Sequence, residues 1–467
     1  MRTELLLSLS FAFLTSCVVG PDYQLPDSPA PQGWSEMGGE RLSSGTADLA
    51  RWWTSFGDPT LNGLVTRALA SNLDLKQAAA RVREARAEVG RVRGELLPEV
   101  DAAGSVTRGR TSENGQFPVP DPTSDLYSAG FDARWELDLF GGNRRALEAA
   151  EADVAASLED RRAVLVSLLG EVARAYVDLR GNQRQAAVVR ENVAAARATL
   201  ELTRTRRAAG LASELDVSRA TSLLASTEAP LPQFDAAARV AIHRLGVLLG
   251  EEPGSLAQEL EQERPIPAPP EQILIGLPSE LLARRPDVRR AERELAAATA
   301  RIGVAVAERY PSFSLSGAFG LESLSSSDFT DAASRAWSIG PAMRWPLFAG
   351  GRILADIELQ DARAEQAKLA YQQTLLGALE EVENAMVSTL REWDHRRSLA
   401  EAAAAGRRSV ELADDLYRKG LTGFLDVLEA ERELYAAELE LARSEAATSL
   451  NVVSLYKALG GGWESEG

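Results

Sequence analysis

The chain has 467 residues, of which 45% are hydrophobic and 25% charged, and its 68 acidic residues against 51 basic ones give a net charge of −17 at pH 7. This acidity argues against nucleic acid or an anionic membrane surface as the main partner. Length alone suggests two to three compact domains, but the internal repetition described below overrides that estimate.

The N-terminus has the features of a secretory signal that ends at a cysteine. Arg2 precedes an apolar run over residues 5–14, and Cys17 is the single cysteine of the chain. The segment Leu14-Thr15-Ser16-Cys17 resembles a bacterial lipobox, so we expect residues 1–16 to be a signal peptide and Cys17 to be lipidated. The alternative is a lone structural cysteine. By resemblance to sorted lipoproteins, Val18 after the cysteine favours the outer membrane.

Residues 17–57 are rich in Pro, Gly and Ser, which predicts a lipidated, extended N-terminal segment. Asp58-Pro59 then forms a helix start, with Asp as the N-cap and Pro in the first turn. The next helix carries apolar residues at alternating spacings of three and four, which predict a coiled-coil seam that ends at Pro98. These residues are Leu75, Ala78, Val82, Ala85, Val89, Val92 and Leu96.

Two stretches after Pro98 alternate apolar and polar residues with the period of a β-strand. They cover about residues 100–108 and 127–136, and the polar loop between them carries turn residues throughout. We therefore predict a hairpin with a long loop.

The first long helix is predicted from Gly142 to Ala209, a proline-free stretch of 68 residues that would extend about 100 Å. Gly210 and Ser213 indicate a tight reversal at about residues 207–214. A returning helix runs toward residue 250 and carries Pro230 and Pro232, which should break or kink it.

The same order of elements recurs after a Pro-rich connector at residues 251–279, so the chain is read as repeat 1 (residues 58–250) and repeat 2 (residues 280–459). The heptad positions return 213 residues later, as Val288, Ala291, Leu295, Ala298, Ile302 and Ala305. Strands are predicted at about 312–321 and 337–345. A second long helix ends at Gly420, with a reversal at about 417–424, and residues 460–467 form a tail.

Each of the four predicted strands is about long enough to cross a bilayer when tilted. Aromatic residues stand eight positions apart in two of them, close to the separation of the aromatic girdles of an outer-membrane barrel. These residues are Tyr127, Trp135, Trp337 and Trp345. Four strands cannot close a barrel, so several copies must contribute to one. The alternative is a soluble sandwich that buries these aromatic residues.

Several motifs resemble those of the TolC-type outer-membrane efflux channels, in the lipoprotein branch that serves resistance-nodulation-division pumps. They are CVVGPDYQLP, FGDPTLNGLVTRALASNLDL after WW, RRPDVRRAE, RYPSFSLSG, MRWPLFAGGR and LYKALGGGW. The resemblance implies a mainly α chain with a membrane β part: a homotrimer with one twelve-stranded barrel in the outer membrane on an α-helical periplasmic tunnel. It also implies a periplasmic adaptor (membrane fusion protein) and an inner-membrane transporter as partners. Pro230, beside the family's usual proline at 232, is a departure.

The resemblance further implies that the helix reversals form the periplasmic tip, where the tunnel closes and the adaptor docks. The residues that match the docking turns are Arg207, Gly210, Leu211, Ser213, Tyr417, Arg418, Gly420 and Leu421. Leu425, Asp426 and Glu429 stand where the family has its constriction. Asp426 and Glu429 share a helical face, so threefold symmetry would place six carboxylates around one axis. Without the resemblance, these residues are solvated surface charges.

No catalytic or cofactor motif can be assembled from the sequence. His243 and His395 lack metal-ligand spacing, and the glycine pairs at 141–142 and 350–351 lack the Lys-Ser or Lys-Thr of a phosphate loop. We therefore expect a passive efflux duct for small toxic molecules that is not an enzyme and has no cofactor. The alternatives are a type I protein secretion channel and, less favoured, a lipid-anchored coiled-coil scaffold.

Overall fold

The computed structural model describes residues 18–26, 31–36, 41–45, 49–114 and 122–463. Cys17, the signal segment and the middle of the predicted long loop lie outside these residues. The chain divides into two compact units. The strand unit comprises Met1–Asp27, Arg81–Leu158 and Arg290–Gln372, and the helical unit comprises Ser28–Ala80, Glu159–Arg289 and Gln373–Gly467. The long helices α4 (Gly142–Ala208) and α10 (Arg352–Arg418) contribute residues to both.

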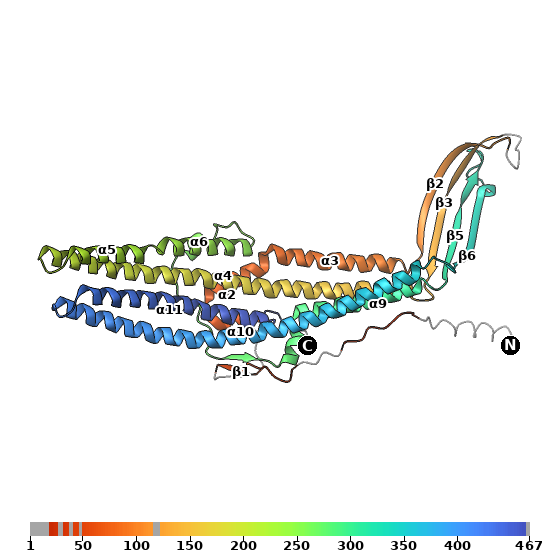
Figure 1. Cartoon of the computed structure of the whole chain (residues 1–467). Helices are drawn as coiled ribbons and strands as arrows, with labels where there is room; N and C mark the ends of the chain where they lie inside the picture. The colour runs from red at the N-terminus through yellow and green to blue at the C-terminus, as the bar shows by residue number, and fades with distance from the viewer. Residues whose placement is uncertain (1–17, 27–30, 37–40, 46–48, 115–121, 464–467) are drawn as a thin grey trace. The chain divides into compact units, whose positions relative to one another are not determined.

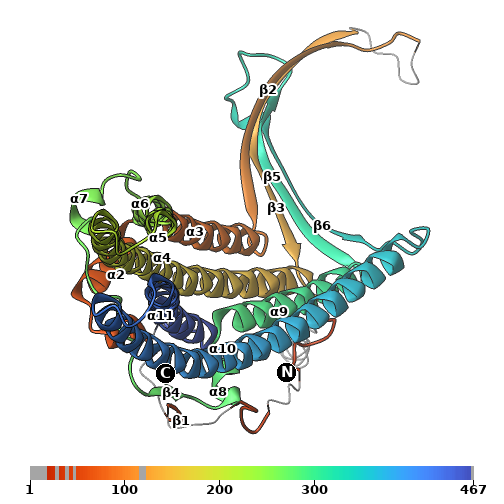
Figure 2. The same cartoon turned by 60° about the vertical axis from the view of Figure 1, so that its left-hand side comes forward.

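The strand unit contains one antiparallel sheet with the order β2-β3-β5-β6 (Figure 2). Its strands are β2 (Glu99–Arg110), β3 (Thr123–Leu137), β5 (Ser312–Ser323) and β6 (Arg335–Arg344). Among the described strands of this sheet, only β3 and β5 have a partner on both sides. The sheet therefore ends in two open edges, β2 and β6, each at least ten residues long.

The register of the sheet places the predicted apolar residues on one face. Phe131 lies opposite Phe319, which lies opposite Trp337, so three aromatic side chains form a row across the sheet. All three are exposed in the single chain, Trp337 to 74%. The other face carries the polar partners of the alternation. Trp345, predicted to be the last residue of its strand, lies one position beyond β6, because the chain turns toward α10 at Pro346.

The helices agree with the proline and glycine signals. The heptad helices are α3 (Leu73–Gly94) and α9 (Pro286–Ala307). The returning helix is interrupted at Pro230 as predicted, into α5 (Glu214–Glu228) and α6 (Leu231–Leu248). The last helix, α11 (Phe424–Ala458), is continuous. Figures 1 and 2 show α5 beside α4 and α11 beside α10.

The helical unit has a core of aromatic and aliphatic side chains around helix α2 (Pro59–Ser71). Asp58 caps α2 by accepting hydrogen bonds from the backbone N–H groups of Thr60 and Leu61, and its other carboxylate oxygen accepts one from the Tyr176 hydroxyl. Trp52 is 2% exposed and stacks on Tyr456. The cap thus joins the start of α2 to the middle of α4.

Two segments predicted to be irregular contain short regular elements. The N-terminal segment forms β1 (Leu42–Ser44) and the 3₁₀-helix η1 (Trp52–Phe56). The connector forms α7 (Ala257–Leu260) and β4 (Ile273–Ile275) before α8 (Pro278–Arg284). β1 and β4 pair in parallel, so each stretch becomes a strand only through the other, and neither has a signal of its own. None of the helices in the described part of the chain has the length and hydropathy needed to cross a membrane.

Candidate functional site

The two helix reversals are built on left-handed glycines. Gly210 has φ +75° and Gly420 has φ +73°, a conformation that favours glycine. Each glycine N–H donates to the carbonyl three residues earlier, and the following leucine N–H donates to the carbonyl five residues earlier. Ser213 then starts α5 in a capping box with Asp216, whereas Gly423 starts α11 without a side-chain cap.

Two of the predicted docking residues present apolar side chains at the reversals. Leu211 is 67% exposed and Leu421 is 72% exposed. Arg207 forms an ion pair with Glu214 across the first turn, and Arg418 forms one with Asp414. Such exposed pairs add little stability, so these side chains remain available to a partner.

Tyr417, which was predicted to belong to the docking turns, is buried and does not lie on the surface of the chain. It is 4% exposed and its ring packs against Phe424. Arg206, a residue that the sequence analysis did not single out, places its guanidinium over the Tyr417 ring at 4.4 Å and donates to the carbonyl of Arg418 at 3.4 Å. Tyr417 is buried because α4 and α11 cover it, and Arg206 joins the end of α4 to the end of α10.

The predicted constriction residues lie together on one exposed face of α11. Leu425, Asp426 and Glu429 are all exposed, whereas their neighbours Val427 and Leu428 are buried. Asp426 also accepts a hydrogen bond from the Thr422 hydroxyl in the turn before the helix. Both carboxylates are therefore exposed on the side of α11 that faces away from the reversal core. This core comprises Ala196, Leu200, Ala220, Leu223, Tyr417, Phe424, Val427, Leu428, Leu434 and Tyr435.

A buried carboxyl group lies beside this core. Glu431 is 3% exposed, and its Oε1 accepts a hydrogen bond from the Thr199 hydroxyl at 2.5 Å. Its Oε2 and the nearby Tyr435 hydroxyl are buried and have no hydrogen-bond partner among the described residues. Burial, reinforced by the charge of Asp414, raises the pKa of Glu431 to about 7. The sequence offers no signal for this group, because its burial depends on contacts between α11 and α4.

The indoles of Trp135 and Trp345 bind the backbone where the strands meet the helices. Trp135 Nε1 donates to the carbonyl of Leu96 at 3.0 Å, and Trp345 Nε1 donates to that of Arg309 at 3.1 Å. Both Trp135 and Trp345 are exposed in the single chain, and their place in an aromatic girdle stays a prediction. Tyr127 packs against Phe329, from the segment between β5 and β6.

The residues after the predicted lipidation site are held by one buried arginine. Arg145, with its side chain 4% exposed, donates from Nε to the carbonyl of Val19 and from a terminal nitrogen to Asp22 at 2.7 Å. The Val19 N–H donates to the carbonyl of Phe140. Gly20, at φ +91°, crosses so close to Gly303 that a side chain at residue 20 would collide with its backbone. The segment that follows Cys17 is thus fixed to α4 and α9.

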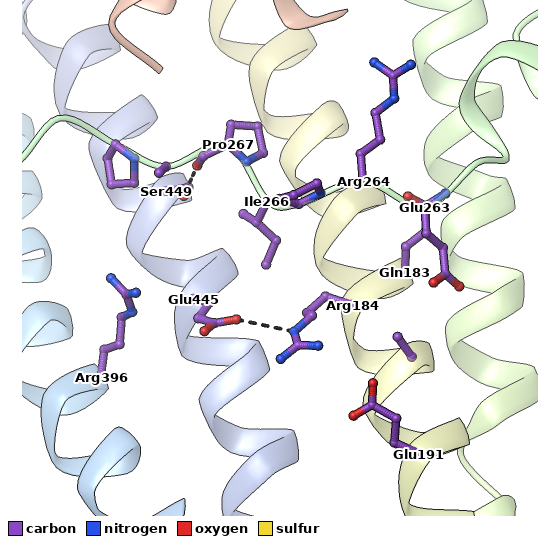
Figure 3. A pocket seen from close by; sticks show the side chains of 14 residues that line it. Gln183, Arg184, Glu191, Glu263, Arg264, Ile266, Pro267, Arg396, Glu445 and Ser449 are labelled. Carbon is purple, nitrogen blue, oxygen red and sulfur yellow. Dashed lines mark hydrogen bonds and ion pairs between the residues drawn. The ribbon is translucent and has the colours of Figure 1, made fainter. Parts of the chain in front are cut away.

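A cavity of about 590 Å³ lies beneath the Pro-rich connector in the helical unit (Figure 3). The carbonyl of Pro267 accepts a hydrogen bond from Ser449, and Arg184 faces Glu445 at 3.7 Å. The guanidinium of Arg180, which is fully buried, donates to the carbonyl of Gln262 at 2.7 Å and fastens the start of the connector to α4. These contacts explain how an irregular segment remains attached. In the described residues, no cluster of three or more His, Cys, Asp or Glu could hold a metal ion.

The family model described as "Outer membrane efflux protein" matches residues 64–251 and 277–461, which together make up most of the chain and both repeats. The chain belongs to the outer membrane efflux protein family. This membership confirms the resemblance that the motifs indicated, and the efflux function with it; the family and its relatives do not favour a secretion channel.

Relatives and solved structures match this efflux protein over nearly its full length. It is 34% identical to "Nodulation protein T" of Rhizobium leguminosarum bv. trifolii, over 96% of this chain and 95% of that one. It is 36% identical to "Pyoverdine export outer membrane protein OpmQ" of Pseudomonas aeruginosa, over 94% and 92%. The solved structure of the outer-membrane channel OprN superposes with a TM-score of 0.89 at 39% identity, covering 96% of this chain and all of that one.

Proposed function

We propose that this efflux protein is the exit duct of a three-part pump, in which three copies share one twelve-stranded outer-membrane barrel above an α-helical periplasmic tunnel. The observation that carries the proposal is the four-stranded sheet with one apolar face and two open edges. An exposed apolar face needs lipid, and unpaired edges in lipid need another strand. Four strands are too few to close a barrel, and three copies supply twelve, enough to leave a passage.

The lipid anchor belongs to the same proposal. Residues 1–16 act as a signal peptide, and Cys17 carries the lipid on a segment that runs to residue 57. Repeats 58–250 and 280–459, joined by the connector 251–279, each supply two strands and one reversal. The contacts of Arg145 with Val19 and Asp22 support this proposal. They fix the residues after Cys17 in the same unit as the strands, where a lipid anchor on Cys17 would be needed.

The reversals are proposed as the periplasmic tip, where a periplasmic adaptor docks and an inner-membrane resistance-nodulation-division transporter delivers substrate. Exposed Leu211 and Leu421 suit an adaptor that presents apolar side chains. Asp426 and Glu429 form the gate, with six carboxylates around the axis of the trimer. Opening swings α10 and α11 outward and breaks the contacts of Arg206 with Tyr417 and Arg418.

Small molecules are the proposed cargo, and the pump selects them. The name of OpmQ refers to pyoverdine export, which is an observation about that relative and supports small-molecule cargo here. The experiment is reconstitution of the full-length lipidated protein into planar bilayers without adaptor or energy source. Discrete ion-conducting steps support a passive duct, whereas membrane insertion without any conductance would contradict it.

A further inference from the structure

The internal duplication makes the contacts between the two repeats a template for contacts between copies. Within the chain, β3 of the first repeat pairs with β5 of the second (Figure 2). The open edges are their counterparts: β6 corresponds to β3, and β2 corresponds to β5. We propose that β6 and the start of α10 bind β2 and the end of α3 of a second copy through repeat-equivalent contacts, with Arg363 paired to Glu88 and Phe348 packed on Leu97. This inference rests on the proposed shared barrel.

The backbone of the two repeats is equivalent at the helix-to-strand corner. Leu97 N–H donates to the carbonyl of Gly94 at 3.0 Å, and Tyr310 N–H, 213 positions later, donates to that of Ala307 at 3.0 Å. The two residues before each of them make the same turn. Leu97 and Tyr310 therefore occupy equivalent positions at the bases of β2 and β5.

An aromatic contact between the two repeats has no counterpart within the described part of the chain. Phe140 stacks on Tyr310 at 4.7 Å between ring centroids. Its equivalent in the second LFGG-like motif is Phe348, which is 92% exposed, and the equivalent of Tyr310 is Leu97, which is 63% exposed. Two large apolar side chains thus lie open at the positions where the duplicated contact would bring them together in two copies.

An ion pair follows the same rule with its charges exchanged. Arg301 of α9 donates to Asp153 of α4 within the chain. The residue 210 positions after Asp153 is Arg363, and the residue 213 positions before Arg301 is Glu88. Both are exposed, and Glu88 also pairs with Arg91 on its own helix. Within the chain the base is on α9 and the acid on α4, whereas between copies the acid is on α3 and the base on α10. The charges are therefore complementary in both contacts.

A helix-interior glycine supports the same approach of α10. Gly303 of α9 lies under the Arg145 side chain, so closely that a methyl group there would collide with it. Its counterpart in α3 is Gly90, which has open space around it in the single chain although a helix-interior glycine costs about 1 kcal/mol relative to alanine. The counterpart of Arg145 is Ala355, at the start of α10. Gly90 and Ala355 are both small, so they leave room for α10 of a second copy to approach α3.

If β6 pairs with β2 of a second copy in the register that β3 and β5 have within the chain, the apolar faces of both strands lie on the same side of the joined sheet. Ala133 of β3 lies opposite Gly317 of β5, so the duplication places Met343 of β6 opposite Gly104 of the second copy. Both of these residues lie on the apolar face of their strands. A register shifted by one residue would place one apolar face against a polar one.

The test is charge exchange in the full-length protein. Glu88→Arg and Arg363→Glu, each alone, set like charges against each other and should lower the dissociation temperature of the detergent-resistant oligomer by about 1–2 °C. The double variant should recover most of this loss, because opposite charges face each other again between the copies, although the pair of Glu88 with Arg91 stays broken. Arg408→Glu is the control, because its repeat counterpart, Ala198, is exposed and carries no charge. If the double variant loses as much dissociation temperature as the two single variants together, the inference is overturned. The proposed function is tested separately, because it requires only that the wild-type protein forms the oligomer.

A second readout does not depend on stability. A photo-crosslinking phenylalanine analogue at position 348 should join two copies, with the adduct on the peptide that contains Leu97. The same analogue at position 140 is the matched control and should give only an intrachain adduct with the Tyr310 peptide. Adducts at position 348 with lipid alone, or with another part of the partner copy, would contradict the proposed contact.

Discussion

The hydroxyl of Thr199 donates a hydrogen bond of 2.5 Å to the carboxyl group of Glu431, and this bond joins α4 to α11 inside the helical unit. The other oxygen of Glu431 is buried and accepts no hydrogen bond from the part of the chain that the structure describes. The site is thus suited to a neutral carboxyl group and disfavours a charged one.

Replacing Glu431 with Gln should make this contact insensitive to pH. The pKa of Glu431 is raised to about 7 in the folded chain, so its stabilising protonation is complete below the unfolded pKa of about 4.5 and is lost as the pH rises through 7. We expect the variant to gain about 3 kcal/mol over the wild type at pH 8 and little at pH 4. Thermal unfolding at both pH values measures this, with Glu429→Gln as the exposed control. Equal gains in stability at both pH values would contradict a buried Glu431 whose pKa is raised.

Removing the exposed carboxylates of the proposed gate should open it. Asp426→Ala combined with Glu429→Ala removes six charges from a trimer and the contact between Asp426 and Thr422. Closed-state conductance in planar bilayers should rise several-fold, because the constriction loses both its side chains and its cation-binding ring. Glu433→Ala, at an exposed position one turn further along α11, is the control. Unchanged closed-state conductance would place the constriction elsewhere.

Arg145→Lys should release the segment after the lipidation site. Lysine keeps the charge but has one nitrogen in place of the two, Nε and a terminal nitrogen, from which arginine donates to the carbonyl of Val19 and the carboxylate of Asp22. We expect backbone amides in residues 18–23 to exchange hydrogen roughly tenfold faster, the effect of losing about 1.4 kcal/mol. Arg93→Lys, in an exposed pair with Glu151, should leave that exchange unchanged. Unaltered exchange in Arg145→Lys would show that other contacts hold the segment.

Trp52→Ala should destabilise the helical unit more than any exposed substitution. Trp52 is 2% exposed, stacks on Tyr456 at 5.3 Å and meets Trp53 and Phe56 edge-on. Truncation leaves a cavity and should cost about 3–5 kcal/mol. Thermal unfolding followed by circular dichroism measures the loss, and Leu211→Ala, at an exposed reversal, should cost less than about 0.5 kcal/mol. A small loss for Trp52→Ala would mean that the surrounding side chains close the cavity.

The sequence predicted the features that depend on local patterns. Alternation predicted the strands and their apolar face, the heptads predicted α3 and α9, and Pro230 predicted the break between α5 and α6. These signals act over a few residues of one segment, so they are readable without the fold. The positions of the reversals followed from Gly210 and Gly420 for the same reason.

Contacts between distant segments could not be predicted in this way. Tyr417 was assigned to a docking surface, but it is buried beneath Arg206, which lies 211 positions earlier in the chain. The burial of Glu431 depends on Thr199, and β1 exists only because β4 pairs with it. In each case, the residue type is ordinary for its own helix or strand, and only its partner decides its environment.

The central claim is that one copy cannot form the pore and that three copies share it. Native mass spectrometry of the full-length protein released from detergent micelles measures this directly. The account predicts a complex with three times the mass of one lipidated chain. A monomer of this fold under the same conditions, with the sheet edges β2 and β6 left unpaired, would contradict it.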